Sequence, residues 1–391
     1  MHTIRPIRDL FIKIRWEKVC ALWLLSLAAL VVRIISLFFW RTPRKKSILI
    51  VEPFGMGDVI SLIPLIESLH INGYKTFLAA KPEWKDLFES ATCPEWMGAP
   101  LPWAVYDKEN KYKLTPYFGR QLWRFVTTLR QKTSGSIGLD PRGDVRSIIL
   151  LYLAGCERVI TLDRYLGTTA KIPLWLGSRV SSGTSLRRWQ IACRMLPAVD
   201  STLAISTSPP AIQKLPTKLG RPIRIGLLPA APWSGRLWQT SKWQQLSKRL
   251  GEKGFNLLGV CGPGQSQYSN ECLPNVKVIQ VTSIDDWIAA LSRVDIVVTL
   301  DSGPMHLADA LGIPIVALFG PGQLPMWAPS GQNAFVVHHQ DCPDFSPCHQ
   351  VPGNEIFGSL YMNKIECQEV ENAVDAITVS IDKQHGQNQE R

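Results

Sequence analysis

Short runs of β-branched and aliphatic residues alternate with helix-like stretches from residue 47 to residue 319, and this alternation limits the fold more than any other feature. Continuous apolar runs are typical of strands buried in parallel sheets, which are connected by helices. In the first half we predict strands at 47–52, 76–80, 136–139 and 157–161, and helices at 58–70, 83–90, 118–132 and 144–154. In the second half we predict strands at 223–228, 256–260, 295–300 and 314–319, and helices at 240–253, 285–292 and 305–311. The pattern predicts an α/β protein with two doubly wound halves.

A Pro-rich, polar segment at residues 206–222 interrupts this alternation, and we interpret it as a linker between two domains. It separates an N-terminal domain at 47–205 from a C-terminal domain, with its tail, at 223–391. A distinct segment, 1–46, precedes both. Ligands of open α/β sheets bind beyond the carboxyl ends of the strands, so we expect a cleft between the two domains to hold a large ligand.

The net charge of +11 is concentrated at the N-terminus, because residues 1–46 contain ten Lys or Arg and only two acids. The rest of the chain is nearly neutral. Nucleic-acid binding would require basic residues clustered on a folded domain, so this charge distribution argues against a nucleic-acid partner. It indicates instead a segment that meets an acidic surface.

Within that segment, residues 19–40 are apolar except for Arg33, and 22 residues would form a helix of about 33 Å, long enough to span a bilayer. A signal peptide is disfavoured because no small-residue cleavage site follows. Three interpretations stay open: a single span, a helix lying in the membrane interface, and a buried helix of the fold. Either membrane interpretation attaches the protein to a bilayer through residues 10–46 and leaves residues 47–391 outside it.

The nine cysteines are odd in number and include no C-x-x-C, which favours a reducing compartment over a disulfide framework. Cys342, Cys348 and His349, with His338 and His339 nearby, match no common zinc spacing. We therefore expect no metal site.

The first candidate site follows the first predicted strand, in the sequence Glu52-Pro-Phe-Gly-Met-Gly-Asp58. Gly55 and Gly57 allow the backbone to approach a ligand closely. Asp58 is either a helix N-cap or a general base at the carboxyl end of the sheet, and this motif alone does not decide between them.

The second candidate site lies between a strand and a helix, at residues 299–308. The strand places Asp301 at the carboxyl end of the sheet, Ser302 and Gly303 form the turn, and Pro304 suits the first helical turn. The amides of Gly303, Met305 and His306 could bind a diphosphate, because a helix N-terminus attracts anions. The alternative is an ordinary capped helix with a buried histidine.

Two further loops could contact the same anion. Gly320 lies in the Phe319-Gly-Pro-Gly turn after the next strand, and Ser234, Arg236 and Lys242 follow the first strand of the second half. Arg presents a fork of donors to phosphate. Each loop considered alone is also consistent with a simple turn or a solvated basic segment.

Four segments together resemble glycosyltransferase family 9, the heptosyltransferase family. The most specific is IVVTLDSGPMHLADALGIPIVALFGP at 296–321. The others are ILIVEPFGMGDVISLIPLIESL at 48–69, GLDPRGDVRSIILLYLAG at 138–155 and PAAPWSGRLWQTSKWQQLSKRL at 229–250. They occur in the family's order, so the resemblance covers nearly all of the chain after residue 46.

The resemblance implies a GT-B architecture, two Rossmann-like domains facing a central cleft, here with an additional N-terminal hydrophobic helix. It implies inverting, metal-independent transfer of a heptose or related sugar, without a cofactor, from a nucleotide diphosphate donor to a lipopolysaccharide or other lipid-linked saccharide. Asp58 matches the family's base, residues 302–306 its diphosphate-binding turn, and Asp301 a position facing the donor sugar. Arg236 matches a basic position near the phosphates. The enzyme would then act at the cytoplasmic face of a bacterial inner membrane.

One departure concerns the nucleotide, because Gln265 stands where family members commonly have a Glu that contacts the ribose. The departure leaves ADP open as the donor nucleotide. Two other functions also stay open: a catalytically silent relative that binds a nucleotide sugar, and a GT-B-type nucleotide-sugar epimerase.

Overall fold

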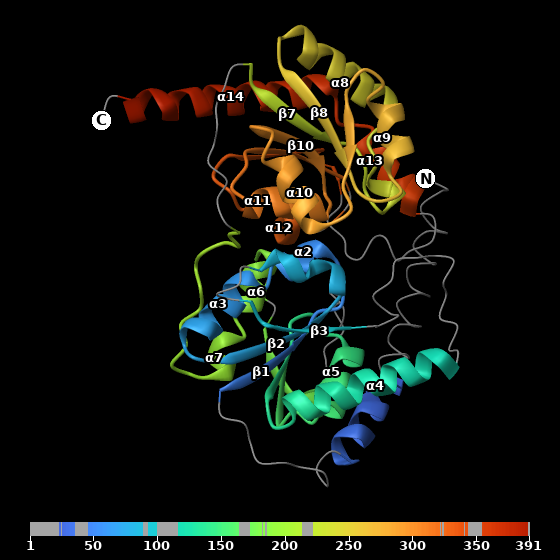
Figure 1. Cartoon of the computed structure of the whole chain (residues 1–391), viewed down its shortest axis with the longest axis vertical. Helices are drawn as coiled ribbons and strands as arrows, with labels where there is room; N and C mark the ends of the chain where they lie inside the picture. The colour runs from blue at the N-terminus through green and yellow to red at the C-terminus, as the bar shows by residue number, and fades with distance from the viewer. Residues whose placement is uncertain are drawn as a thin grey trace. The chain divides into compact units, whose positions relative to one another are not determined.

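The computed structural model describes residues 23–24, 26–35, 46–88, 93–99, 116–163, 173–181, 183, 186–212, 222–320, 322, 324–339, 341–342 and 354–389. The chain divides into two compact units, Met1–Ser208 and Pro209–Arg391 (Figure 1). Each unit contains a six-stranded sheet whose strand pairs are all parallel.

The sheet of the first unit has the order β3-β2-β1-β4-β5-β6. Its strands are β1 (Ser47–Val51), β2 (Lys75–Ala80), β3 (Glu95–Gly98), β4 (Ile137–Asp140), β5 (Arg158–Leu162) and β6 (Ser178–Val180). The helices are α2 (Met56–Ile60), α3 (Ile63–Ile71), η1 (Pro82–Leu87), α4 (Pro116–Thr133), α5 (Val145–Leu153), η3 (Leu174–Leu176), α6 (Arg188–Cys193) and α7 (Leu196–Val199). Leu49 and Val51 of β1 pack with α4 and α5 in one buried cluster, while α3 packs against α6 and α7.

The sheet of the second unit has the order β12-β11-β10-β7-β8-β9. Its strands are β7 (Arg224–Leu228), β8 (Asn256–Cys261), β9 (Val278–Gln280), β10 (Ile296–Leu300), β11 (Ile315–Phe319) and β12 (Ala334–His338). The helices are η4 (Ser234–Arg236), α8 (Thr240–Glu252), α9 (Ser266–Cys272), α10 (Ile284–Leu291), α11 (Gly303–Ala310), α12 (Leu324–Trp327), α13 (Asn354–Met362) and α14 (Cys367–Gln389). Trp238 and Trp243 are fully buried edge to face in its core, 5.2 Å between ring centroids.

The structure confirms the α/β class and every predicted strand, but it divides one predicted helix. The stretch predicted as a single helix at 58–70 forms α2 and α3, separated at Ser61 and Leu62. Pro64 lies in the first turn of α3, where its missing N–H costs no hydrogen bond. The stretch predicted as a helix at 83–90 is instead the 3₁₀ helix η1. Sequence analysis did not predict the outer strands β3, β6, β9 and β12 or the C-terminal helices α13 and α14.

Residues 26–35 form a helix of the first unit, and Ala29 lies in the same buried cluster as α4 and α5. Much of the segment predicted to attach to a membrane, including residues 1–22 and 36–45, lies outside the described residues. Among the residues that are described, no helix has both the length and the apolar character needed to cross a membrane.

Candidate functional site

Both sheets have the strand order of a Rossmann fold, and in each the candidate residues follow the two central strands. The connections leave β1 and β4 in opposite directions along the first sheet, and those of β7 and β10 do the same in the second. Ligands of open α/β sheets bind at this switch point, beyond the carboxyl ends of the strands. Each unit therefore has one candidate ligand site, at the switch point of its sheet.

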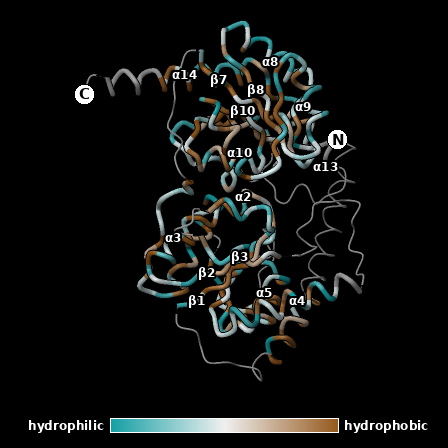
Figure 2. The backbone as a smooth tube through the Cα atoms, viewed as in Figure 1, coloured by the Kyte–Doolittle hydropathy of each residue, from teal (hydrophilic) through white to brown (hydrophobic). Residues whose placement is uncertain are grey.

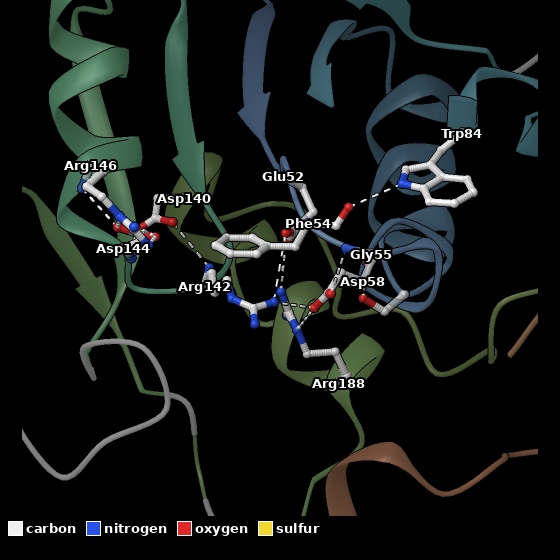
Figure 3. Close-up of polar contacts among 11 residues, drawn as sticks. Glu52, Phe54, Gly55, Asp58, Trp84, Asp140, Arg142, Asp144, Arg146 and Arg188 are labelled. Carbon is white, nitrogen blue, oxygen red and sulfur yellow. Dashed lines mark hydrogen bonds and ion pairs between the residues drawn. The ribbon is translucent and has the colours of Figure 1, made fainter. Parts of the chain in front are cut away.

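In the first unit, Asp58 lies in the first turn of α2, directly beyond β1 (Figure 3). The backbone N–H of Gly55 donates to Asp58 Oδ2 at 3.2 Å, which closes the turn between strand and helix. The carboxylate is buried. Gly55 is the N-cap residue of α2 and Gly57 lies within the helix, and neither has a positive φ. Because Asp58 accepts from the Gly55 amide, it has a local structural role whatever its chemical role.

Two arginines from distant parts of the chain point at this carboxylate. Arg142, in the loop after β4, donates from Nη1 to Asp58 Oδ1. Arg188, at the start of α6, places its Nε 3.9 Å from the same oxygen and donates from Nη2 to Glu52 Oε2 at 2.9 Å. Figure 3 shows both guanidinium groups between Glu52 and Asp58. We call these four residues the carboxylate–arginine cluster.

The loop that carries Arg142 is itself held by buried acids. Asp140 accepts hydrogen bonds from the amides of Arg142 and Asp144 and from the hydroxyl of Thr161. Asp144 caps α5 by accepting from the amide of Arg146. The Arg142 guanidinium stacks 3.9 Å above the centre of the Phe54 ring. These contacts fix Arg142 on both sides.

Burial shifts the titration of the acids behind the site. Burial raises the pKa of Glu52 to about 8, with a further rise from Asp58 and opposing effects from Arg142 and Arg188. Burial also raises the pKa of Asp140 to about 7, against the hydrogen bond from Thr161. In the cluster, Glu52 Oε1 and Arg188 Nη1 are buried with no hydrogen-bond partner among the described residues.

Of this cluster, sequence analysis singled out only Asp58 as a site residue, together with the neighbouring Gly55 and Gly57, and not Glu52, Arg142 or Arg188. Arg142 lies in the segment GLDPRGD, which entered only through the family resemblance. Arg188 follows another arginine in a stretch with no recognisable motif, so no local signal indicated it. Only the parallel pairing of β1 with β4, and the packing of α6 on α3, bring these side chains together.

In the second unit, β10 delivers Asp301 and Ser302 to the N-terminus of α11. Ser302 is the N-cap residue in extended conformation, but its hydroxyl caps no amide. Ser302 Oγ is buried without a hydrogen-bond partner in the described part of the chain. The amide of Met305, one of the three expected to bind the diphosphate, donates instead to the Ser302 carbonyl at 3.2 Å.

Arg236, at the end of η4, crosses from the loop after β7 to this turn. Its Nη2 lies 2.9 Å from Asp301 Oδ2, and its Nη1 donates to the Asp301 carbonyl at 3.0 Å. Its Nε is buried and lacks a hydrogen-bond partner among the residues described. Two buried donors, this Nε and the Ser302 hydroxyl, therefore remain unsatisfied at the same switch point, at a cost that a ligand with acceptor oxygens would remove.

The other residues predicted for the donor site differ in burial and in their local contacts. The His306 ring is half-buried beside Trp327, 5.7 Å between centroids. Ser234 is exposed at the start of η4. Gln265 Oε1 accepts from the amide of Gly262 at 3.0 Å and so closes its own turn. The Met305 side chain is fully buried in the core.

At two further positions predicted to contact the phosphate, Gly320 and Lys242, the structure shows packing or hydrogen-bonding roles that the sequence did not reveal. A Cβ at Gly320 would come within 2.7 Å of Met362 Sδ, so any larger residue there would displace the buried Met362 side chain. Lys242 Nζ donates to the carbonyls of Asn363 and Ile365 and contacts Glu366, so it holds the turn between α13 and α14 rather than a phosphate. Among the described residues, no three His, Cys, Asp or Glu side chains lie together as metal ligands, and Cys348 and His349 lie outside those residues.

The fold defined by these two Rossmann-type sheets is that of the GT-B class of glycosyltransferases. The solved structure titled "E. coli heptosyltransferase WaaC with ADP" aligns with 85% of this chain and 99% of its own, with a TM-score of 0.64 and 18% identity. Residues 195–350 match the family model described as glycosyltransferase family 9 (heptosyltransferase). This match begins near the end of the first unit and covers most of the second.

The curated relatives that the chain resembles are named as heptosyltransferases. Lipooligosaccharide heptosyltransferase 2 of Campylobacter jejuni is 30% identical over 124 residues, which are 29% of this chain and 39% of the relative. Lipopolysaccharide heptosyltransferase 1 of Pseudomonas aeruginosa is 24% identical over 294 residues, 70% of this chain and 78% of the relative. The chain thus spans about two fifths of the length of the first of these relatives and more than three quarters of the second.

Proposed function

We propose that the protein transfers a heptose or related sugar from a nucleotide diphosphate donor to a lipopolysaccharide or other lipid-linked saccharide, with inversion and without a metal. The observation that carries this proposal is the turn at Asp301 and Ser302, where Arg236 contacts Asp301, within the residues that match the family model. Its two unsatisfied buried donors require acceptor oxygens, and a diphosphate supplies them. The names of the relatives support a heptose as the sugar.

The proposed donor site stabilises the leaving diphosphate through its own charges. The guanidinium of Arg236 and the N-terminus of α11 are both positive ends directed at one turn. Groups of this kind stabilise charge that develops in the transition state without reorganising during the reaction. In this proposal they do the work that a metal ion does in other glycosyltransferases.

Asp58 is the proposed base that removes the proton of the acceptor hydroxyl, which then attacks the anomeric carbon opposite the diphosphate. Its Oδ1 accepts a hydrogen bond from the Arg142 guanidinium, whereas its Oδ2 accepts a weaker, neutral hydrogen bond from the backbone N–H of Gly55 at 3.2 Å. Oδ2 is therefore the oxygen we assign to the acceptor hydroxyl. Arg142 and Arg188 would hold the carboxylate in position.

We further propose that the N-terminal segment attaches the enzyme to the cytoplasmic face of a bacterial inner membrane. The support is the charge of residues 1–46 and the apolar stretch at 19–40. An acceptor carried on a lipid would be presented at such a surface. Nucleic acid has no place in this proposal.

The donor site is tested by nucleotide binding to the full-length chain in mild detergent. We expect one of ADP, UDP, GDP, CMP and dTDP, with EDTA present, to stabilise the protein by about 2.7 kcal/mol at 100 times its Kd. The double variant Arg236→Met/Asp301→Asn removes the site's ion pair without leaving an unpaired charge, and we expect it to lose this stabilisation.

The matched control is Arg224→Met/Asp295→Asn, which removes another Arg–Asp pair with its nitrogen and oxygen 2.7 Å apart. This pair lies at the N-terminal ends of β7 and β10, whereas the candidate site lies at their carboxyl ends. This control should keep the nucleotide-induced shift. If both double variants respond to nucleotide like the parent chain, the donor site has been placed wrongly. If no nucleotide stabilises even the parent chain, the transferase proposal fails.

The base is tested by Asp58→Asn. General-base loss lowers turnover by about 10²–10⁴-fold. We expect that loss in release of the nucleotide found by the binding screen from its heptose donor, with a heptose-free lipopolysaccharide acceptor. Nucleotide-induced stabilisation should persist, which separates loss of the base from misfolding. Full turnover in this variant would contradict the base assignment. Conversion of the sugar without acceptor would favour an epimerase, and retained binding with no turnover in the parent would favour a catalytically silent relative.

A further inference from the structure

The helix at residues 26–35 has its polar and apolar faces reversed with respect to a helix on the surface of a protein in water. Ser26 and Ala29 are fully buried against the rest of the first unit. Ala29 and Arg33 lie about one and two helical turns after Ser26, so all three residues are on the same face. The opposite face, which is exposed, consists of large apolar residues: Trp23, Leu24, Leu27, Val31, Ile34 and Ile35. Surface helices in water bury such residues and expose the polar ones.

Specific contacts fix this orientation. Ala29 packs in the cluster with α4 and α5, and Val32 packs against it. Arg33 donates from Nη1 to the carbonyl of Trp175, and its guanidinium lies 5.9 Å from the centre of the Tyr152 ring. The one charged residue of the helix is therefore held by the folded unit.

A second segment, far away in the sequence, extends the exposed apolar surface. Leu174 and Trp175 of η3 are 71% and 39% exposed. The Trp175 ring lies 6.1 Å from that of Trp23, which joins the two segments. We call the six exposed apolar residues between Trp23 and Ile35, together with Leu174 and Trp175, the apolar face. Figure 2 shows the helix as largely hydrophobic beside α4.

We propose that the apolar face is a docking surface for an anionic lipid bilayer, on which the helix lies flat instead of spanning it. The occupant is argued from charge, because residues 1–46 around this helix have a net charge of +8. Basic residues flanking an apolar helix face, with tryptophan at its edge, are typical of helices in the membrane interface. This inference rests on the membrane attachment proposed above and specifies its geometry.

A flat orientation follows from the contacts with the folded unit. A spanning helix is surrounded by lipid or by other spanning segments, whereas this helix has one face covered by α4 and α5. Arg33, bound to Trp175, lies on the protein side and need not enter lipid.

The test compares vesicle binding of the full chain with that of Leu174→Ser. Leu174 lies 139 residues from Ile35, so a simple N-terminal span predicts no effect of this change. The docking geometry predicts about tenfold weaker flotation with phosphatidylglycerol–phosphatidylethanolamine vesicles, since one exposed leucine no longer enters the bilayer. It also predicts much weaker binding of the parent chain to neutral phosphatidylcholine vesicles and its release from membranes at alkaline pH.

The matched control is Ile71→Ser/Ile205→Ser, which removes exposed apolar side chains from elsewhere in the same unit. It should bind vesicles like the parent chain, and the nucleotide-induced shift should be unchanged in both variants. Resistance to alkaline extraction, with normal binding of Leu174→Ser, would overturn flat docking while leaving attachment in place. Absence of binding to any vesicle would overturn attachment as well, and an equal loss in the control would show that the apolar face has no special role. None of these outcomes depends on whether the protein transfers a sugar.

Discussion

At the scale of single residues, the two sites share one device, a carboxylate held by an arginine from the neighbouring loop. Asp58 follows β1 and contacts Arg142, which follows β4. Asp301 follows β10 and contacts Arg236, which follows β7. In each case the pair joins the two strands on either side of the switch point. A ligand that binds there meets a fixed positive charge whose position is set by two adjacent strands.

The raised pKa of Glu52 gives a prediction about pH. A carboxyl group whose pKa is higher in the folded state than in the unfolded one stabilises the fold at low pH, and this contribution is lost as the pH rises from about 4.5 through about 8. Glu52→Gln cannot titrate, so its free energy of unfolding should fall less between pH 5.5 and pH 8 than that of the parent. We expect the difference to exceed about 1 kcal/mol, because one pKa unit corresponds to about 1.4 kcal/mol.

Urea unfolding at the two pH values measures this difference. The control is Glu371→Gln, because hydrogen bonds from Lys253 and Arg249 lower the pKa of Glu371. Its stabilising effect is lost only at acidic pH, so this variant should be destabilised equally at pH 5.5 and pH 8. A Glu52→Gln variant destabilised by several kcal/mol at pH 5.5 would show that the ion pair with Arg188 outweighs burial.

At the scale of elements, the position of Arg236 depends on the contact between η4 and α13. These elements meet backbone to backbone, since a Cβ built on Gly358 would lie 2.2 Å from the carbonyl oxygen of Gly235. No side chain fits between them. The C-terminal helix α13, which sequence analysis did not predict, thereby supports the donor site.

Gly358→Ala should therefore separate η4 from α13. We expect a loss of about 1–3 kcal/mol in the free energy of unfolding, the usual cost of overpacking, and weaker binding of the nucleotide diphosphate because η4 carries Arg236. Chemical unfolding and nucleotide titration measure the two effects. The control, Gly251→Ala in α8, meets no atom within 4 Å and should stabilise the protein by about 0.4–1 kcal/mol. Normal binding by Gly358→Ala would mean that η4 keeps its position without this contact.

At the scale of the whole molecule, the two units have separate hydrophobic cores. One contains β1, α4 and α5, and the other contains β7, α8 and α14. Because the cores are separate, we expect two calorimetric transitions in the full chain. A ligand stabilises the unit that binds it, so the nucleotide diphosphate should raise the midpoint temperature of one transition by a few degrees. Arg236→Met/Asp301→Asn should abolish that rise and leave the other transition unchanged. A single transition that shifts as a whole would mean that the two units unfold together.

The sequence by itself determined the class of fold and the central strands. Strands such as β1, β10 and β11 are buried along their whole length, so they appear in the sequence as unbroken apolar runs. The outer strand β12 is as long as these but partly exposed, and sequence analysis did not identify it. Because the unbroken apolar runs mark where the central strands end, the turns that follow them were recognisable. Asp58, Asp301 and Ser302 were identified in this way.

Only the tertiary structure decided which side chains meet those residues. Arg142 and Arg188 lie 84 and 130 residues from Asp58. The segment around Arg142 drew attention only through the family resemblance, and the one around Arg188 contains no recognisable motif. Strand order, not sequence proximity, brings the loops after β1 and β4 together, and the same holds for β7 and β10. The reversed helix at 26–35 has the same explanation. Its composition left three interpretations open, and packing alone assigned Ser26 and Arg33 to the protein and the large apolar side chains to the outside.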